Sequence, residues 1–151
     1  MIQDLNRAID HTLLKADATE AQILELCQEA REYSFFSVCV NSAWVSFCKN
    51  TLKGSGVKVV SVVGFPLGAN ISSVKAFETE QALKAGAEEI DMVLNVGALK
   101  SKKLNEVEQD IKAVVTAAAG FPVKVILETS SLSDQEIIEA LFIRINNAIH
   151  N

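Results

Sequence analysis

Residues 89–96 read EIDMVLNV, an apolar run that is interrupted by Asp91 and Asn95. Its nearly continuous aliphatic residues are typical of a parallel strand that is covered on both faces. Residues 123–128, VKVILE, repeat this pattern with Lys124 inside the run. Because a buried charge without a partner is unfavourable, we expect Asp91 and Lys124 to face each other from neighbouring strands.

Two earlier apolar runs, residues 36–40 (FSVCV) and 57–63 (VKVVSVV), are also predicted strands. Helical patterns lie before, between and after the four runs. The predicted helices begin near Thr19, Ser42, Ser72 or Ser73, Lys103 and Ser133. The order is therefore a helix followed by four strand–helix units.

Two of these helix starts carry a capping box, in which a hydroxyl residue is followed three residues later by Glu or Gln. Thr19 is followed by Gln22, and Ser133 is followed by Glu136. Repeated strand–helix units of this kind form either an open doubly wound sheet or a (β/α)8 barrel.

The length of the chain and its polar strand residues favour different architectures. An open sheet of the flavodoxin type is complete at about this length, whereas a barrel needs about 250 residues. Asp91 and Lys124 favour the barrel, because polar strand residues there point into the interior near the catalytic end. A buried ion pair without a catalytic role explains the two residues equally well.

The composition indicates a folded protein that acts on a metabolite. The 151 residues are 49% hydrophobic and 22% charged, and we expect one domain over residues 1–151. The net charge is -5, and the basic residues are scattered, with Lys102 and Lys103 the only adjacent pair. This pattern does not suit nucleic acid or an anionic membrane as a partner.

The cysteines do not suggest a metal site. Cys27, Cys39 and Cys48 have no CxxC spacing, and only His11 and His150 could join them as further ligands. Buried free thiols in a reducing compartment explain them better. The N-terminus lacks the apolar run of a signal peptide, and no stretch is long enough to span a bilayer. We therefore predict no metal and a cytoplasmic protein.

Three other polar features have an ordinary structural explanation. Cys39 lies inside a predicted strand, where packing is the commoner role. Asp10 follows the opening helical segment, and a turn or cap is the usual role of such an aspartate. The loop at residues 64–70, GFPLGAN, lacks the P-loop and GxGxxG patterns, so a structural turn is favoured over a phosphate site.

Taken together, several segments resemble the deoxyribose-phosphate aldolases. The matching segments are IDHTLLK (9–15), SVCVN (37–41), VVGFPLGAN (62–70), KAFE (75–78), AGAEEIDMVLNVGAL (85–99) and VKVILET (123–129). The resemblance implies a (β/α)8 barrel and the reversible cleavage of 2-deoxy-D-ribose 5-phosphate to acetaldehyde and D-glyceraldehyde 3-phosphate. It also implies a class I mechanism without metal or cofactor, in which a lysine forms a Schiff base with the substrate.

The resemblance implies roles for four residues. Asp91 matches the catalytic aspartate that relays protons through water. Lys124 matches a strand lysine that lines the same site, Cys39 a cysteine near the substrate, and Asp10 a residue at the edge of the pocket.

The match ends before the nucleophile of the family. Residues 141–151, LFIRINNAIHN, depart from the pattern, and the chain contains no KTSTGF-like segment, second lysine or late phosphate-binding loops. We therefore expect an incomplete barrel, a truncated aldolase with little or no activity of its own.

An incomplete barrel leaves open sheet edges and a bare apolar face, which favour a homodimer or higher homo-oligomer. Two alternatives stay open at this point: a non-catalytic half-barrel interaction module, and a flavodoxin-like open-sheet binding domain.

Overall fold

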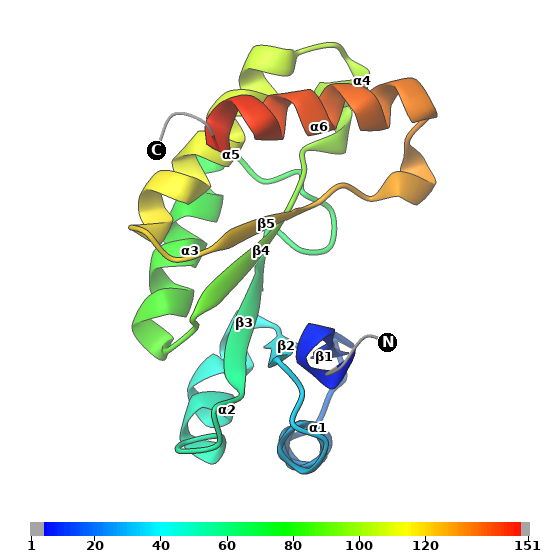
Figure 1. The fold of residues 1–151 in the computed structure, drawn as a ribbon. Helices are drawn as coiled ribbons and strands as arrows, with labels where there is room; N and C mark the ends of the chain where they lie inside the picture. Colours follow the sequence, from blue (N-terminus) through cyan, green and yellow to red (C-terminus); the bar gives the residue numbers. More distant parts are fainter. Residues whose placement is uncertain (1–4, 149–151) are drawn as a thin grey trace. The chain divides into compact units, whose positions relative to one another are not determined.

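Five strands form one sheet, in the order in which they occur along the chain (Figure 1). The computed structural model describes residues 5–148, with side chains up to residue 143. The strands are β1 (Asp10–Leu13), β2 (Ser37–Val40), β3 (Lys58–Val63), β4 (Glu89–Val93) and β5 (Val123–Ile126). The sequential order β1-β2-β3-β4-β5 differs from the flavodoxin order 2-1-3-4-5, so the open-sheet alternative is wrong. The sheet agrees with the predicted incomplete (β/α)8 barrel.

Helices precede, connect and follow the strands. They are η1 (Leu5–Ala8), α1 (Glu20–Glu32), η2 (Ser42–Trp44), α2 (Val45–Thr51), α3 (Ser72–Ala85), α4 (Val96–Lys100), α5 (Leu104–Ala118), η3 (Thr129–Ser131) and α6 (Asp134–Ala148). None of the helices within residues 5–148 combines the length and apolar character that crossing a membrane requires. His150 lies outside the described residues.

The chain divides into two units. Unit 1 comprises the chain up to Val62 together with Gln81–Ile90, and unit 2 comprises Val63–Glu80 and the chain from Asp91 onward. Unit 1 thus contains β1, β2, α1 and α2, whereas unit 2 contains β5, α4, α5 and α6.

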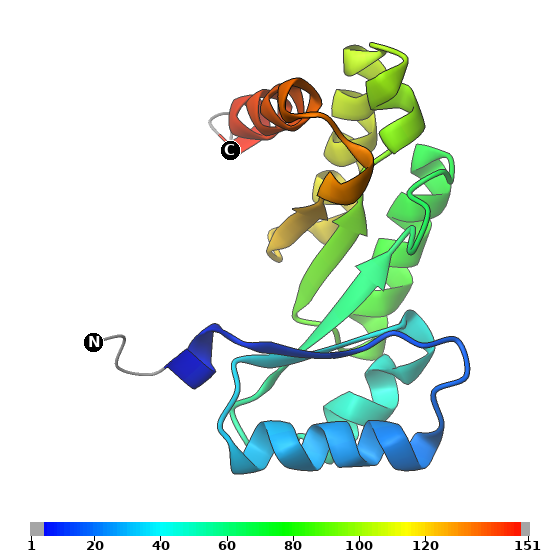
Figure 2. The same cartoon turned by 90° about the vertical axis from the view of Figure 1, so that its right-hand side faces the viewer.

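In unit 1, helix α1 runs along strands β1 and β2 (Figure 2). Its capping box is present as predicted: the Thr19 hydroxyl accepts from the Gln22 amide, and the Gln22 side chain accepts from the Thr19 amide. Helix α1 also buries one apolar face. Its buried residues are Ile23, Leu26, Cys27 and Ala30.

Strand β1 corrects the prediction for Asp10. This residue does not end a turn or cap a helix, because it is the first residue of β1 and pairs with Ser37 of β2. The strand DHTL is short, and three of its four residues are polar, so it lacks the apolar run that identified the other four strands. Backbone pairing with β2 from Asp10 to Leu13 holds it in the sheet.

Two further helical details differ from the predictions. The second helix was expected to begin near Ser42, but Ser42 is the first residue of η2, and α2 begins only at Val45. The short helix α4 was not predicted, and Asn95, expected within a strand, instead caps α4 by accepting from the Ala98 amide at 3.0 Å.

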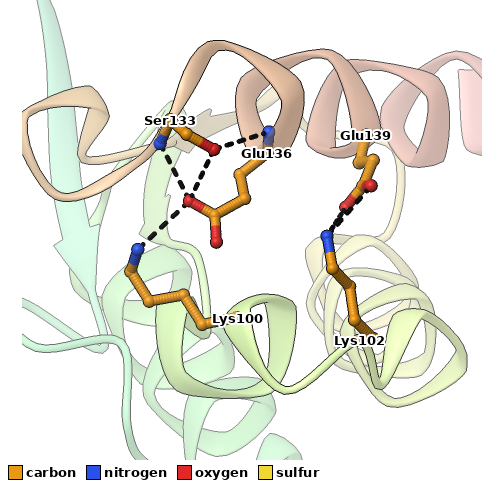
Figure 3. A network of polar contacts seen from close by, with 5 residues as sticks. All are labelled: Lys100, Lys102, Ser133, Glu136 and Glu139. Atoms are coloured by element: carbon orange, nitrogen blue, oxygen red, sulfur yellow. Dashed lines mark hydrogen bonds and ion pairs between the residues drawn. The ribbon is translucent and has the colours of Figure 1, made fainter.

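In unit 2, α6 packs against α4 and α5 (Figure 2). The predicted capping box at its start is confirmed: Ser133 N donates to Glu136 Oε2 at 2.8 Å, and Glu136 N donates to Ser133 Oγ at 3.4 Å. Two ion pairs join α6 to the segment that ends α4 (Figure 3). Lys100 pairs with Glu136 at 3.1 Å, and Lys102 pairs with Glu139 at 2.9 Å.

Candidate functional site

Asp91 of β4 and Lys124 of β5 face each other across neighbouring strands. Lys124 Nζ lies 3.4 Å from Asp91 Oδ1, within ion-pair distance. The Asp91 side chain is 13% exposed and that of Lys124 is 39% exposed, so the pair is only partly screened by solvent. The pairing predicted from the two interrupted apolar runs is therefore confirmed.

The Asp91–Lys124 pair lies on the face of β4 that carries Val93, because residues two apart on a strand share a face. Met92, on the opposite face, is fully buried. Asp91 is thus the one partly exposed residue of a strand that is otherwise buried, and it pairs with the partly exposed Lys124. Such a pair can hold a water molecule or a substrate oxygen between an acceptor and a donor.

In unit 1, Asp10 and Cys39 share one face of the β1–β2 pair. The strand register places Asp10 opposite Ser37 and Thr12 opposite Cys39, and these four side chains therefore point the same way. Ser37 Oγ donates to Asp10 Oδ1 at 2.5 Å. Cys39 is buried.

The other face of β1 packs on helix α1. His11 Nε2 lies 2.6 Å from Glu29 Oε2 of α1, and its ring meets Phe35 edge to face at 5.2 Å. Asp10 and Cys39 consequently lie on the sheet face that points away from α1. In a barrel, the face away from the helices is the interior, where catalytic groups are found.

The four predicted site residues therefore form two pairs. Asp10 and Cys39 lie on adjacent strands of unit 1, and Asp91 and Lys124 are in direct contact in unit 2.

All three cysteines are buried, and none of them forms a disulfide. A hydrogen bond between the thiols of Cys27 and Cys48 lowers the pKa of Cys27 and raises that of Cys48. Within residues 5–148, no group of three or more His, Cys, Asp or Glu side chains is placed to hold a metal ion.

The glycine loop after β3 uses its amides internally. Gly64 N donates to Glu78 Oε2 at 2.8 Å, and Gly68 N donates to Gly64 O at 2.8 Å. A Cβ atom on Gly68 would lie 2.0 Å from Leu94 O, so the loop packs tightly against the end of β4. These contacts fit the structural turn, because two of the amides that an anion would need are already donated.

Sequence reasoning missed a buried ion pair beside this loop. Lys75 Nζ donates to Asp110 Oδ2 at 2.5 Å, and the two side chains are 0% and 4% exposed. A signal for Asp110 was present, since it stands between Val107 and Val114 on the buried face of α5. Lys75 carried no such signal, because α3 has no clear apolar stripe.

The comparisons with known proteins agree with the predicted family. The family model described as DeoC/LacD family aldolase matches residues 5–141. A deoxyribose-phosphate aldolase from Streptococcus sanguinis is 60% identical over 136 residues, which cover 90% of this chain and 62% of that protein. This chain thus spans about three fifths of the length of its curated relative.

Solved structures show the same fold. A candidate deoxyribose-phosphate aldolase from Coccidioides immitis superposes with a TM-score of 0.90 at 43% identity, covering 91% of this chain and 55% of that one. The deoxyribose phosphate aldolase from Aeropyrum pernix, whose structure is described as tetrameric, gives a TM-score of 0.80 at 32% identity. That match covers 94% of this chain and 60% of the other. The chain therefore belongs to the DeoC/LacD family of aldolases.

Proposed function

We propose that this chain provides part of the site of a deoxyribose-phosphate aldolase. The reaction is the reversible cleavage of 2-deoxy-D-ribose 5-phosphate to acetaldehyde and D-glyceraldehyde 3-phosphate. The observation that carries the proposal is the Asp91–Lys124 ion pair at 3.4 Å, on adjacent strands of a chain that belongs to the aldolase family. No metal or cofactor is needed in this chemistry.

Each of the four residues has a role in the proposal. Asp91 relays protons through water during Schiff-base formation and breakdown, and Lys124 lines the same site as a cation. Cys39 lies near the substrate, and Asp10 lies at the edge of the pocket. The strand positions of Asp10 and Cys39, on the face away from α1, support their part in it.

The 151-residue polypeptide is expected to have little or no aldolase activity by itself. It contains no KTSTGF-like segment, where the family resemblance places the Schiff-base lysine. Lys124 is a poor replacement, because the neighbouring Asp91 carboxylate favours the ammonium form and only a neutral amine attacks a carbonyl. The proposal is therefore that residues 1–151 supply part of the family site but not its nucleophile.

Reductive trapping tests the missing nucleophile. The polypeptide is incubated with acetaldehyde and borohydride and digested, and its lysines are examined by mass spectrometry. We expect only slow, non-selective modification of exposed lysines. A stoichiometric adduct on one lysine, lost in the matching Lys→Arg variant, would show that this chain carries a working nucleophile.

The assembly and location form part of the same proposal. We expect a homodimer or higher homo-oligomer, because β1 and β5 are edge strands of the described sheet and edge strands tend to pair. The tetrameric relative from Aeropyrum pernix supports assembly of this kind. The three cysteines, none of which forms a disulfide, support a reducing, cytoplasmic location.

A further inference from the structure

Lys75 is a fully buried cation with two partners that come from different elements. Its Nζ donates to Asp110 Oδ2 of α5 at 2.5 Å and to the Val93 carbonyl oxygen of β4 at 3.0 Å. Val93 is the last residue of β4 and lies two residues after Asp91 on the same strand. The ammonium thus connects α3, α5 and the end of the strand that carries Asp91.

The same helix also holds the end of the neighbouring strand. Glu78, one turn after Lys75 on α3, accepts from the Gly64 amide, which directly follows β3. Gly64 lies so close to Lys75 that a Cβ there would stand 2.9 Å from Lys75 Cε. Two side chains of one helix face therefore fix two consecutive strand ends.

A buried lysine is costly unless its charge is paired and its donors are used. An apolar pair of similar volume often gives equal stability, so stability alone does not explain the charges. What an apolar pair lacks is a donor for the Val93 carbonyl. The specific contribution of Lys75 is therefore the hydrogen bond to the end of β4.

We infer that Lys75, held by Asp110, is a positioning residue that sets Asp91 against Lys124 by fixing the end of β4 through the Val93 carbonyl. This inference rests on the proposed function, since it assigns a role within that same site. Asp110 orients the ammonium, and the ammonium orients the strand end. Asp91, two residues earlier, is thereby kept within ion-pair distance of β5.

The test uses the 151-residue chain and the NMR resonances of Lys124 Nζ and Cε. Asp91→Asn gives the reference displacement of these resonances for a lost ion pair. In Lys75→Met/Asp110→Leu, which removes both charges and leaves the net charge unchanged, we expect the Lys124 resonances to move toward their Asp91→Asn positions. Asp110→Glu keeps both charges but moves the ammonium, and it should give a smaller displacement in the same direction.

The control is Lys102→Met/Glu139→Leu, which removes an ion pair of the same unit that contacts no strand end. This variant should leave the Lys124 resonances unchanged.

Lys124 resonances that stay at their wild-type positions in the folded Lys75 and Asp110 variants would overturn the inference. Resonances that do not respond to Asp91→Asn would instead overturn the Asp91–Lys124 site, and the inference with it. If the Lys75→Met/Asp110→Leu variant does not fold, the Asp110→Glu variant, which keeps both charges, still decides the test.

Discussion

At the scale of single residues, the buried pair Lys75–Asp110 should matter far more for stability than the surface ion pairs. Lys75→Met leaves the Asp110 carboxylate buried without its cation, which should cost about 3–5 kcal/mol of unfolding free energy. Urea unfolding at neutral pH measures this loss. Replacing both residues, as Lys75→Met/Asp110→Leu, should recover most of it.

The matched control for this prediction is Lys103→Met. Lys103 pairs with Glu106 at 3.0 Å, but both side chains are largely exposed. Exposed pairs contribute about 0–1 kcal/mol. Equal losses for Lys75→Met and Lys103→Met would contradict the importance that we give to burial.

Gly68 gives a second prediction at this scale. Its φ of 64° disfavours other residues, and a Cβ would stand 2.0 Å from the Leu94 carbonyl oxygen. Gly68→Ala should therefore lose on the order of 4 kcal/mol or more, the range of severe steric defects. Thermal unfolding followed by circular dichroism measures the loss.

Gly54 separates the cost of the positive φ from the cost of the steric clash. Its φ of 79° is equally unusual, yet no atom lies within 4 Å of the position of a Cβ. Gly54→Ala should cost only the backbone term, about 1–2 kcal/mol. If Gly68→Ala and Gly54→Ala lost the same unfolding free energy, the close approach of Gly68 to Leu94 would not contribute to the loss.

The site residues show what sequence reasoning can and cannot find. Asp91 and Lys124 were predictable as partners because each interrupts an apolar run and a buried charge needs a counter-charge. Lys75 was not predictable in the same way, since its partners come from β4 and α5 and no local pattern encodes them. A tertiary contact of this kind becomes visible only in three dimensions.

At the scale of elements, the continuous strands and the capping boxes were predictable from local sequence. Strands β2 to β5 coincide with the apolar runs of the sequence. Thr19 and Ser133 cap α1 and α6, as the capping-box pattern predicts. Strand β1 was missed because three of its four residues are polar, so it lacks the apolar run of the other strands. Helix α4 was missed because its five residues are too few to show a helical period. Pairing with β2, rather than local preference, determines that β1 is a strand.

The start of α6 should make stability depend on pH. Hydrogen bonds from the Ser133 amide, together with Lys100, lower the pKa of Glu136 from 4.5 to about 2. A carboxyl whose pKa is lower in the folded state stabilises the fold above its unfolded pKa, and this contribution is lost as the pH falls. The contribution of Glu136 should therefore be complete above about pH 5 and disappear between pH 4.5 and about 2.

Urea unfolding of wild type and Glu136→Gln between pH 7 and pH 2 measures this contribution as a difference in stability. The wild type should be more stable at neutral pH, and the two curves should converge as the pH approaches 2. Lys100→Met is a useful companion, because it removes the cation but keeps the Ser133 cap. A difference that stays constant down to pH 2 would rule out the role given to the Glu136 carboxylate.

At the scale of the whole molecule, the edge strands β1 and β5 make self-association the expected state. All four residues of β5 are partly exposed, and an exposed edge strand is a template for pairing with another chain. Sedimentation at micromolar concentration should give a dimer or larger species that dissociates on dilution. A monodisperse monomer across that range would contradict the predicted assembly.

The two units differ in the reactive groups that they bury. All three thiols belong to unit 1, whereas the fully buried amine of Lys75 belongs to unit 2. A thiol reagent should therefore label the protein only when unit 1 opens, and an acylating reagent should reach Lys75 only when unit 2 opens. Labelling both groups in one sample and reading them by mass spectrometry distinguishes one cooperative unfolding event from two. Equal rates at both positions would mean that the chain behaves as the single domain predicted from its sequence.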